Sequence, residues 1–391
     1  MIQYTKWQAE TKDAEILIRR GTKYASSIVD LFDTLLHRTY NPNLLETISM
    51  RDSFPTRPRV AVIGAGAWGT SLARHLAKKG LPVRLWAYER EVVEAIRTTR
   101  ENTIFLPGVA LPSALHATGS LQEVVQDIDL LVFAVPSHAA RSVLQQIGPL
   151  LPRPIPIVSA TKGIEEETLN LISQMMQEIL PLSLHALICV LSGPSFAIEV
   201  CQDQPTAIVL AGQEPDVVRT LQHLFMTSCF RVYAGTDVIG VQLGGALKNV
   251  MALAAGVVDG LNLGHNARAA LITRGLAEMI RLGVALGGDS KTFYGLSGVG
   301  DLVLTCTGPL SRNHTVGIRL GRGETLPDIL KETQGVAEGV RTSSAAAGLA
   351  RRHKIDMPIV RAVGAVLFEG KSPREAVSEL MERAAKEEAE G

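Results

Sequence analysis

The chain has 391 residues, of which 46% are hydrophobic and 20% charged, a composition typical of a packed globular protein with room for two domains. Its 39 lysines and arginines balance 39 aspartates and glutamates, so no net charge attracts it to nucleic acid or to an anionic membrane. The four cysteines have no metal-ligand spacing and follow no signal peptide, and no uninterrupted apolar run reaches the ~18 residues of a membrane span. We therefore expect free buried thiols in a reducing compartment, and any anionic ligand needs a local cluster of cations.

Residues 1–57 differ in character from the rest of the chain. They mix acidic and basic side chains, contain an amphipathic stretch at 27–36, and end in a turn-rich segment at 55–58. A transit peptide is poor in acidic residues, and this segment is not. We predict a helical, partly mobile extension of unknown purpose.

From Arg59 onward, short apolar runs alternate with helical stretches. The runs that predict strands lie at 59–63, 83–86, 130–135, 155–160 and 186–191. Runs that are apolar throughout are typical of parallel strands covered on both faces. Strands separated by helices predict βαβ units and a parallel sheet of the Rossmann type.

After about residue 240 the strand signals stop. Long helical segments rich in Ala, Leu and Gly follow, with breaks near Gly264, Gly287 and Gly308. The predicted fold is α/β, with a Rossmann-type parallel-sheet domain followed by an all-helical domain. The predicted boundaries are 1–57 for the extension, 58–240 for the dinucleotide-binding domain and 241–391 for the helical substrate and catalytic domain.

A glycine motif, Gly64-Ala-Gly66-Ala-Trp-Gly69, directly follows the first strand and opens a helix. In dinucleotide-binding folds the first glycine makes the tight turn, the second admits the pyrophosphate, and the third lets helix and strand pack closely. A glycine-rich turn without a ligand is the alternative, but the strand before and the helix after the motif argue against it. After the second strand, Glu89 would favour NAD and Arg90 would favour NADP, so the cofactor preference stays open.

Two other strand ends carry groups suited to a ligand. Lys162 follows the run at 155–160, and the segment Ser192-Gly-Pro-Ser-Phe-Ala197 follows the run at 186–191. Open α/β sheets bind ligands at the carboxyl ends of their strands. For either segment seen alone, ordinary turn chemistry is the better interpretation.

Lys248 lies in a predicted helix whose neighbours one turn away, Gly244 and Ala252, are small. They would leave room beside the ammonium and offer no carboxylate on that face. Burial would lower the lysine pKa and suit it to proton transfer near neutrality. The alternative is a lysine that extends from an Ala-rich helix into solvent.

A further cluster combines Asp301 and Thr305 with the tripeptide Ser311-Arg312-Asn313. A guanidinium flanked by hydroxyl and amide donors is suited to a phosphate monoester, since its fork makes two directed bonds. Alone, the tripeptide is also common on protein surfaces.

Together these segments resemble the NAD(P)-dependent glycerol-3-phosphate dehydrogenase family of the bacterial type, over about Arg59 to Lys386. The motifs that carry the resemblance are GAGAWG at 64–69, ATKG at 160–163, SGPSFA at 192–197, GVQLGGALKNV at 240–250, ITRGLAEM at 272–279, GDLVLTC at 300–306, SRN at 311–313 and GVAEG at 335–339. The resemblance implies a cytoplasmic, homodimeric oxidoreductase that feeds glycerophospholipid synthesis. It would interconvert dihydroxyacetone phosphate and sn-glycerol 3-phosphate with NAD or NADP, without a metal, a nucleic-acid partner or a membrane span.

The resemblance also implies roles for individual residues. Lys248 matches the acid/base lysine, and Lys162 a second lysine near substrate and cofactor. The other substrate-binding positions are Gly193, Ser195, Asn249, Asp301, Thr305, Ser311, Arg312 and Asn313. The cofactor-binding positions are Gly64, Gly66, Ala67, Trp68, Gly69, Tyr88, Lys162, Ala197, Arg312, Val336 and Glu338. The sequence departs from the family at Tyr88, where many relatives have His or Arg, and in residues 1–57, which typical short bacterial enzymes lack.

Two other functions are compatible with parts of the pattern. One is another two-domain hydroxy-acid dehydrogenase of the β-hydroxyacid group, which also uses a helix-borne lysine; the SRN and GDLVLTC segments argue against it. The other is a protein that binds a dinucleotide as a sensor and has lost catalysis. The sequence argues against it, because each proposed catalytic position holds a side chain able to do the chemistry. In the enzyme, we expect the charge of Lys162 to depress the pKa of Lys248 and Asp301 to be able to orient Lys248.

Overall fold

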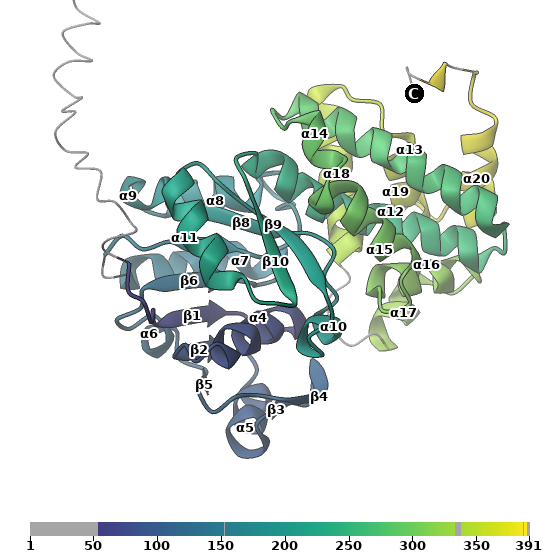
Figure 1. Cartoon of the computed structure of the whole chain (residues 1–391). Coiled ribbons are helices and arrows are strands. Elements are labelled where there is room, and N and C mark those ends of the chain that lie inside the picture. The colour runs from purple at the N-terminus through teal and green to yellow at the C-terminus, as the bar shows by residue number, and fades with distance from the viewer. Residues whose placement is uncertain (1–53, 152, 333–337, 386, 389–391) are drawn as a thin grey trace, which may run out of the picture. The chain divides into compact units, whose positions relative to one another are not determined.

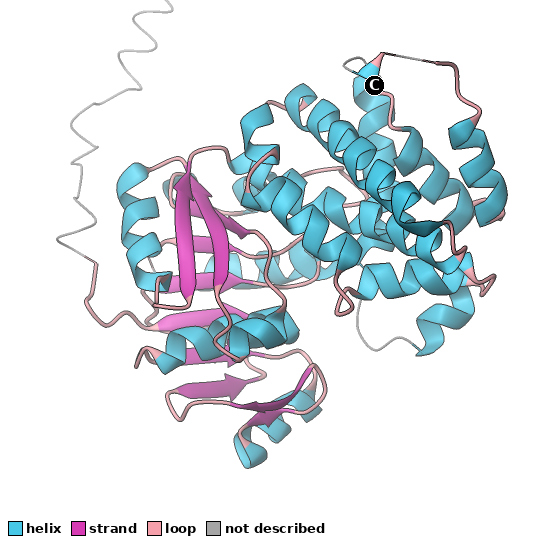
Figure 2. Cartoon of the chain, turned by 45° about the vertical axis from the view of Figure 1, so that its right-hand side comes forward, coloured by secondary structure: helices cyan, strands magenta, loops and turns pink. Residues whose placement is uncertain are grey.

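The computed structural model describes residues 54–388 except 152, 333–337 and 386 (Figure 1). The predicted extension, including its amphipathic stretch at 27–36, therefore lies almost wholly outside the described residues. In the described part, a half built on a Rossmann-like sheet precedes a half whose regular elements are all helical (Figure 2). The predicted fold class is thus confirmed.

The main sheet has eight strands in the order β10-β9-β8-β7-β6-β1-β2-β5. The strands are β1 (Val60–Ile63), β2 (Val83–Trp86), β5 (Leu115–Thr118), β6 (Leu130–Phe133), β7 (Ile157–Ser159), β8 (Ile188–Ser192), β9 (Thr206–Gly212) and β10 (Phe230–Gly235). All five predicted strands are present. Because β1 lies between β2 and β6, the chain reverses its direction of travel across the sheet there, which opens a crevice at the carboxyl edge.

The predicted parallel sheet has one antiparallel pairing, near one edge. Strands β9 and β10 pair in parallel with each other, but β9 runs antiparallel to β8. In β10 exposed residues, among them Arg231, interrupt the apolar ones, so this strand lacks the uninterrupted apolar run that marks the inner strands. Strand β9 does contain such a run, Ala207–Ala211, but neither strand was predicted.

Helices cover both faces of the sheet. The elements of this half are α4 (Ala67–Lys78), α5 (Arg90–Thr99), α6 (Leu121–Val124), α7 (Ser137–Ile147), η2 (Gly148–Leu150), α8 (Ile172–Ile179), α9 (Leu182–His185), α10 (Ala197–Cys201), α11 (Pro215–Phe225) and the hairpin β3–β4 (Glu101–Asn102, Leu106–Ala110). Side chains of α6, α7 and α8 form one core with Ala61 and Ile63 of β1. Helices α4 and α11 pack on the sheet as well, against β1–β2 and β9–β10.

The helical half is built around α12 (Val238–Gly260) (Figure 1). Its other elements are α13 (Gly264–Ala285), α14 (Ser290–Phe293), the π-helical turn η3 (Leu296–Gly300), α15 (Asp301–Thr307), α16 (Arg312–Gly321), α17 (Leu326–Glu332), α18 (Glu338–His353), α19 (Pro358–Phe368) and α20 (Pro373–Met381). Helix α12 is long and apolar enough to cross a membrane by length and composition, but 89% of its apolar window is buried inside the protein. Its apolar surface therefore belongs to the core of this half.

Glycines bring the backbones of α12 and α16 into direct contact. A Cβ on Gly256 would lie 2.1 Å from the His314 carbonyl oxygen, and one on Gly317 would lie 2.1 Å from that of Leu253. One turn further on, Gly260 and Gly321 repeat the arrangement, with a Cβ on Gly260 falling 3.0 Å from the Gly321 Cα. Any side chain here would force the helices apart, so these glycines set their separation.

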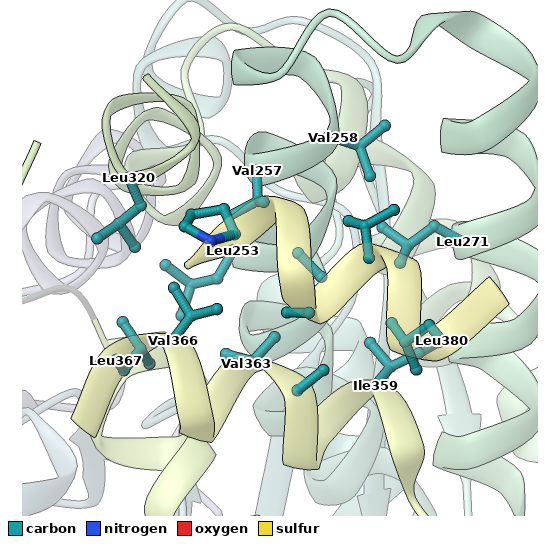
Figure 3. A pocket seen from close by; sticks show the side chains of 15 residues that line it. Leu253, Val257, Val258, Leu271, Leu320, Ile359, Val363, Val366, Leu367 and Leu380 are labelled. Atoms are coloured by element: carbon teal, nitrogen blue, oxygen red, sulfur yellow. The ribbon is translucent and has the colours of Figure 1, made fainter. Parts of the chain in front are cut away.

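An apolar cavity lies between α12, α19 and α20 (Figure 3). Its walls include Leu253 and Val257 from α12, Val363 and Leu367 from α19, and Leu380 from α20. Every residue that lines it is apolar, so it offers nothing to orient a phosphate or to move a proton. This cavity is therefore not the active site.

We predict that Gly317→Ala lowers the free energy of unfolding by about 1–3 kcal/mol, because the added methyl group overpacks the contact between α12 and α16. Gly364→Ala on α19 is the matched control, since a Cβ there meets no atom within 4 Å. Relief of the glycine entropy cost should make that control slightly more stable. Urea denaturation of both variants and the unaltered protein measures the difference. Equal free energies of unfolding for the two variants would contradict the role of Gly317 in setting the separation of α12 and α16.

Candidate active site

The three motif glycines occupy the three positions that a dinucleotide loop requires. Gly64 has a φ of 108°, and a Cβ there would lie 2.6 Å from the Ala134 carbonyl oxygen at the end of β6. Gly69 touches the loop itself, since its Cβ would lie 1.9 Å from the Gly64 oxygen. Gly66 is exposed, and a Cβ there would meet nothing within 4 Å. The backbone is thus open only where a pyrophosphate would approach.

The start of α4 is suited to an anion. Gly66, the N-cap, supplies no side-chain acceptor, and no acidic residue lies in the first turn, which contains Ala67 and Trp68. The Trp68 indole nitrogen is buried without a protein partner. Asn102 holds the loop from behind, donating at 2.8 Å to both the Ala65 oxygen and the Thr70 hydroxyl. The open backbone and the uncapped helix end fit the pyrophosphate of a dinucleotide.

Glu338, the first residue of α18, meets the sheet half beside the loop after β6. Its carboxylate accepts hydrogen bonds from the Ser137 backbone nitrogen at 3.2 Å and the Ser137 hydroxyl at 2.7 Å. A Cβ on Gly163 would lie 3.1 Å from the same carboxylate. Burial raises the pKa of Glu338, while the bonds from Ser137 act in the opposite direction. Lys162 and Glu338 therefore flank one corner of the crevice.

One buried carboxylate joins the two predicted lysines. Lys162 Nζ lies 2.9 Å from Asp301 Oδ2, and Lys248 Nζ donates to Asp301 Oδ1. Lys248 also donates to the Thr305 hydroxyl at 2.9 Å, and Lys162 to the Gly193 carbonyl oxygen at 3.4 Å. Asp301 is fully buried and Lys248 is 6% exposed. A lysine from each half of the described chain thus shares one counter-charge.

Burial is the main influence on Lys248. Burial lowers the pKa of that ammonium, Asp301 raises it and the charge of Lys162 lowers it, and the net result is a pKa of about 7. The predicted direction and its predicted causes, burial and the charge of Lys162, are confirmed. The prediction that small neighbours leave room beside the ammonium is wrong. Gly244 does not leave space beside the ammonium, because a Cβ there would lie 2.2 Å from the Ser297 carbonyl oxygen. The small residue instead seats η3 directly on α12, and η3 leads into Asp301.

The tripeptide predicted to bind a phosphate, Ser311-Arg312-Asn313, lies at the start of α16. Ser311 caps the helix by accepting from the His314 nitrogen at 3.3 Å, and Arg312 follows with its side chain exposed. The Asn313 amide donates to Asn249 Oδ1 at 3.0 Å and accepts from the Gly339 nitrogen at 3.0 Å. Asn313 therefore ties α16 to the residue after Lys248 and to the residue after Glu338.

The remaining predicted residues are more dispersed. Gly193 and Ser195 lie together after β8, where the Ser195 hydroxyl donates to the Gly193 oxygen at 2.9 Å. Ala197 opens α10, and its carbonyl accepts from Ser71 of α4 at 3.1 Å. Tyr88 is 84% exposed beyond the end of β2, away from the lysines. Val336 lies outside the described residues.

Sequence reasoning missed three residues that support the site. Ser137 follows β6 at the sheet's carboxyl edge, and that position was an available signal. Asn102 and Gln242 carried no signal, since each acts only through contacts distant in sequence. The Gln242 amide accepts from the Ser173 nitrogen at 2.9 Å and donates to the Ser173 hydroxyl at 2.7 Å, which fastens α12 to α8 of the sheet half.

A dinucleotide loop, together with two lysines that share a buried carboxylate between a Rossmann-like half and a helical half, defines a nicotinamide-dependent dehydrogenase. Comparison with known proteins identifies the family. Models of the N- and C-terminal parts of NAD-dependent glycerol-3-phosphate dehydrogenase match residues 59–218 and 237–378. The chain belongs to the NAD-dependent glycerol-3-phosphate dehydrogenase family, and it is an oxidoreductase that uses NAD or NADP.

Individual relatives and solved structures support the same family assignment. The glycerol-3-phosphate dehydrogenase (NAD(P)+) of Geobacter sulfurreducens is 56% identical over 330 residues, 84% of this chain and 98% of that protein. The crystal structure of the Coxiella burnetii glycerol-3-phosphate dehydrogenase is 39% identical with a TM-score of 0.81, and the Saccharomyces cerevisiae enzyme is 30% identical with a TM-score of 0.71. Each covers 84% of this chain, and the chain covers 100% of each. A ketopantoate reductase at 15% identity and a TM-score of 0.54 shares the fold alone.

We predict that Asp301→Asn destabilises the protein by about 3–5 kcal/mol near pH 6, because the buried ammonium of Lys248 and the part-buried one of Lys162 lose their counter-charge. The deficit should shrink as pH rises toward 9. Lys248, whose pKa is lowered to about 7 in the folded state, then releases its proton and no longer needs a counter-charge, while the unfolded chain still binds that proton. Denaturant melts at pH 6 and 9 measure the effect; a deficit independent of pH would contradict the shared counter-charge.

Proposed function

We propose that this chain reduces dihydroxyacetone phosphate to sn-glycerol 3-phosphate, and catalyses the reverse reaction, in support of glycerophospholipid synthesis. The observation that carries the proposal is the buried Lys162–Asp301–Lys248 arrangement beside the start of α16. A proton donor and a phosphate-binding group are thus available within one crevice. Bound nicotinamide supplies or accepts the hydride.

We assign the phosphate to the first turn of α16. Arg312 is exposed there and carries a permanent charge with two directed donors. The positive end of the helix dipole adds to the attraction. Ser311 and Asn313 already have partners, in His314 and in Asn249 and Gly339, so they shape the turn as well as offering donors.

We assign the proton to Lys248. With a pKa lowered to about 7, its ammonium can donate to the C2 oxygen of the ketone, and the neutral amine can accept the proton in the reverse direction. Lys162 stabilises the negative charge that develops on that oxygen. Asp301 and Thr305 hold Lys248 in place, since Lys248 donates to both.

Three further proposals come from the same family likeness. The dinucleotide-binding domain spans 58–240 and the helical domain 241–391; the start of α12 at Val238 supports this boundary. The enzyme acts in the cytoplasm, and it is a homodimer. Sedimentation velocity of the full chain tests the dimer.

An initial-rate assay tests the activity itself. We expect turnover of dihydroxyacetone phosphate with NADH or NADPH, and little turnover of 2-keto acids, because Arg312 and the dipole of α16 favour a phosphate dianion over a carboxylate. The comparison of the two cofactors also determines the preference that Glu89 and Arg90 leave open. Faster turnover of a keto acid would overturn the proposal in favour of the β-hydroxyacid group.

We predict that Lys248→Met lowers kcat by about 10²–10⁴, the usual contribution of a general acid or base, with the Kd for the cofactor unchanged. In the unaltered enzyme, kcat/KM for reduction should fall as pH rises through about 7, because the ammonium loses its proton. In the oxidising direction it should rise over the same range. Lys331→Met, on the exposed surface of α17, is the control. Near-normal turnover by Lys248→Met would exclude the assignment.

A further inference from the structure

A chain of polar side chains lies behind the first turn of α16, and the proposed reaction does not use it. His314 Nε2 lies 2.8 Å from Asp259 Oδ2, and the same oxygen lies 2.9 Å from Arg268 Nη1. Arg268 Nη2 in turn lies 2.9 Å from Nδ1 of His265 at the surface. His314 is only 7% exposed. Because a carboxylate only accepts, the imidazole donates to Asp259.

This series of hydrogen-bonded side chains is too far from Lys248 to take part in the proton transfer. Asp259 stands near the carboxyl end of α12, eleven residues after Lys248, which places their Cα atoms about 16 Å apart along the helix. His314, by contrast, lies two residues after Arg312 in the same helical turn. Any effect on the reaction must pass through the position of that turn.

His314 is held at two points. Its backbone nitrogen donates to Ser311, and its ring donates to Asp259 on the neighbouring helix. The glycine contacts fix how closely α16 approaches α12, yet van der Waals contact between bare backbones has no preferred direction. A hydrogen bond between a buried imidazole ring and a carboxylate does have a preferred direction. Together with the hydrogen bonds of Asn313, it fixes the rotation of α16 about its axis, and with it the direction in which Arg312 points.

We propose that Asp259 and His314 are positioning residues for the substrate phosphate. Their hydrogen bond orients the first turn of α16 so that the Arg312 guanidinium faces the crevice. Arg268 supports the pair by sharing the Asp259 carboxylate. The inference rests on the proposed function, in which Arg312 binds the phosphate.

The test compares two substrates that differ only in the phosphate: dihydroxyacetone phosphate and dihydroxyacetone. His314→Ala should raise KM for dihydroxyacetone phosphate by about 10- to 100-fold, the scale of a small misplacement of a binding group, and change kcat at saturation less than about 3-fold. Its kcat/KM for dihydroxyacetone and its Kd for the cofactor should stay unchanged. His314→Gln should recover most of the loss, because its amide nitrogen can still donate to Asp259.

Three further variants keep the outcome decisive even if His314→Ala folds poorly. Asp259→Ala should show the same selective loss, and the double variant of Asp259 and His314 should lose no more than either single one. Arg322→Ala, an exposed arginine at the other end of α16, is the control and should behave like the unaltered enzyme. Equal losses of kcat/KM for both substrates would show a purely structural role and overturn the inference.

Arg312→Ala separates this inference from the proposed function. If Arg312→Ala discriminates against the phosphorylated substrate and His314→Ala does not, the positioning role is wrong and the proposed function stands. If Arg312→Ala itself leaves KM for dihydroxyacetone phosphate unchanged, the phosphate assignment fails, and the inference fails with it.

Discussion

The site depends on one buried carboxylate shared by two lysines. Lys162 from the sheet half and Lys248 from the helical half would repel each other in a region of low dielectric. Asp301, fully buried between them, lets both remain there, with one oxygen facing each ammonium. The balance is close, because burial lowers the pKa of Lys248 to about 7 in spite of the carboxylate. The same contact thus stabilises the fold and affects the acidity of Lys248.

Close backbone packing delivers that carboxylate to its position. Gly244 lets η3 rest on α12 one turn before Lys248, and Asp301 follows η3 directly. Three turns further along, Gly256 and Gly260 bring α16 against the same helix. Helix α12 therefore carries the lysine and also sets the positions of the two segments that serve it. Contacts between bare backbones bring these helices close together, and directional hydrogen bonds such as those of Asp259 and Gln242 set their orientation.

Much of this could be predicted from the sequence, for reasons that are local. Inner strands can be recognised in the sequence as apolar runs. The glycine motif between the first strand and its helix indicates a dinucleotide-binding loop in any Rossmann-like fold. Strand β10 was not predicted because exposed residues such as Arg231 break its apolar run, whereas β9 was overlooked although its run at Ala207–Ala211 is unbroken. The small neighbours of Lys248 were noticed but misread, since the sequence cannot tell an empty space from one filled by another backbone.

The sequence by itself determined the fold class, the dinucleotide loop and the residue types available for chemistry, because each depends on spacing along a single strand or helix. The tertiary structure alone decided which of those residues meet. Lys162 and Asp301 are 139 positions apart, and Ser137 and Glu338 are 201 positions apart. No periodicity links such positions; the packing of helices through their glycines does. For the same reason the pairing of Asp259 with His314, 55 positions apart, becomes visible only once α16 lies on α12.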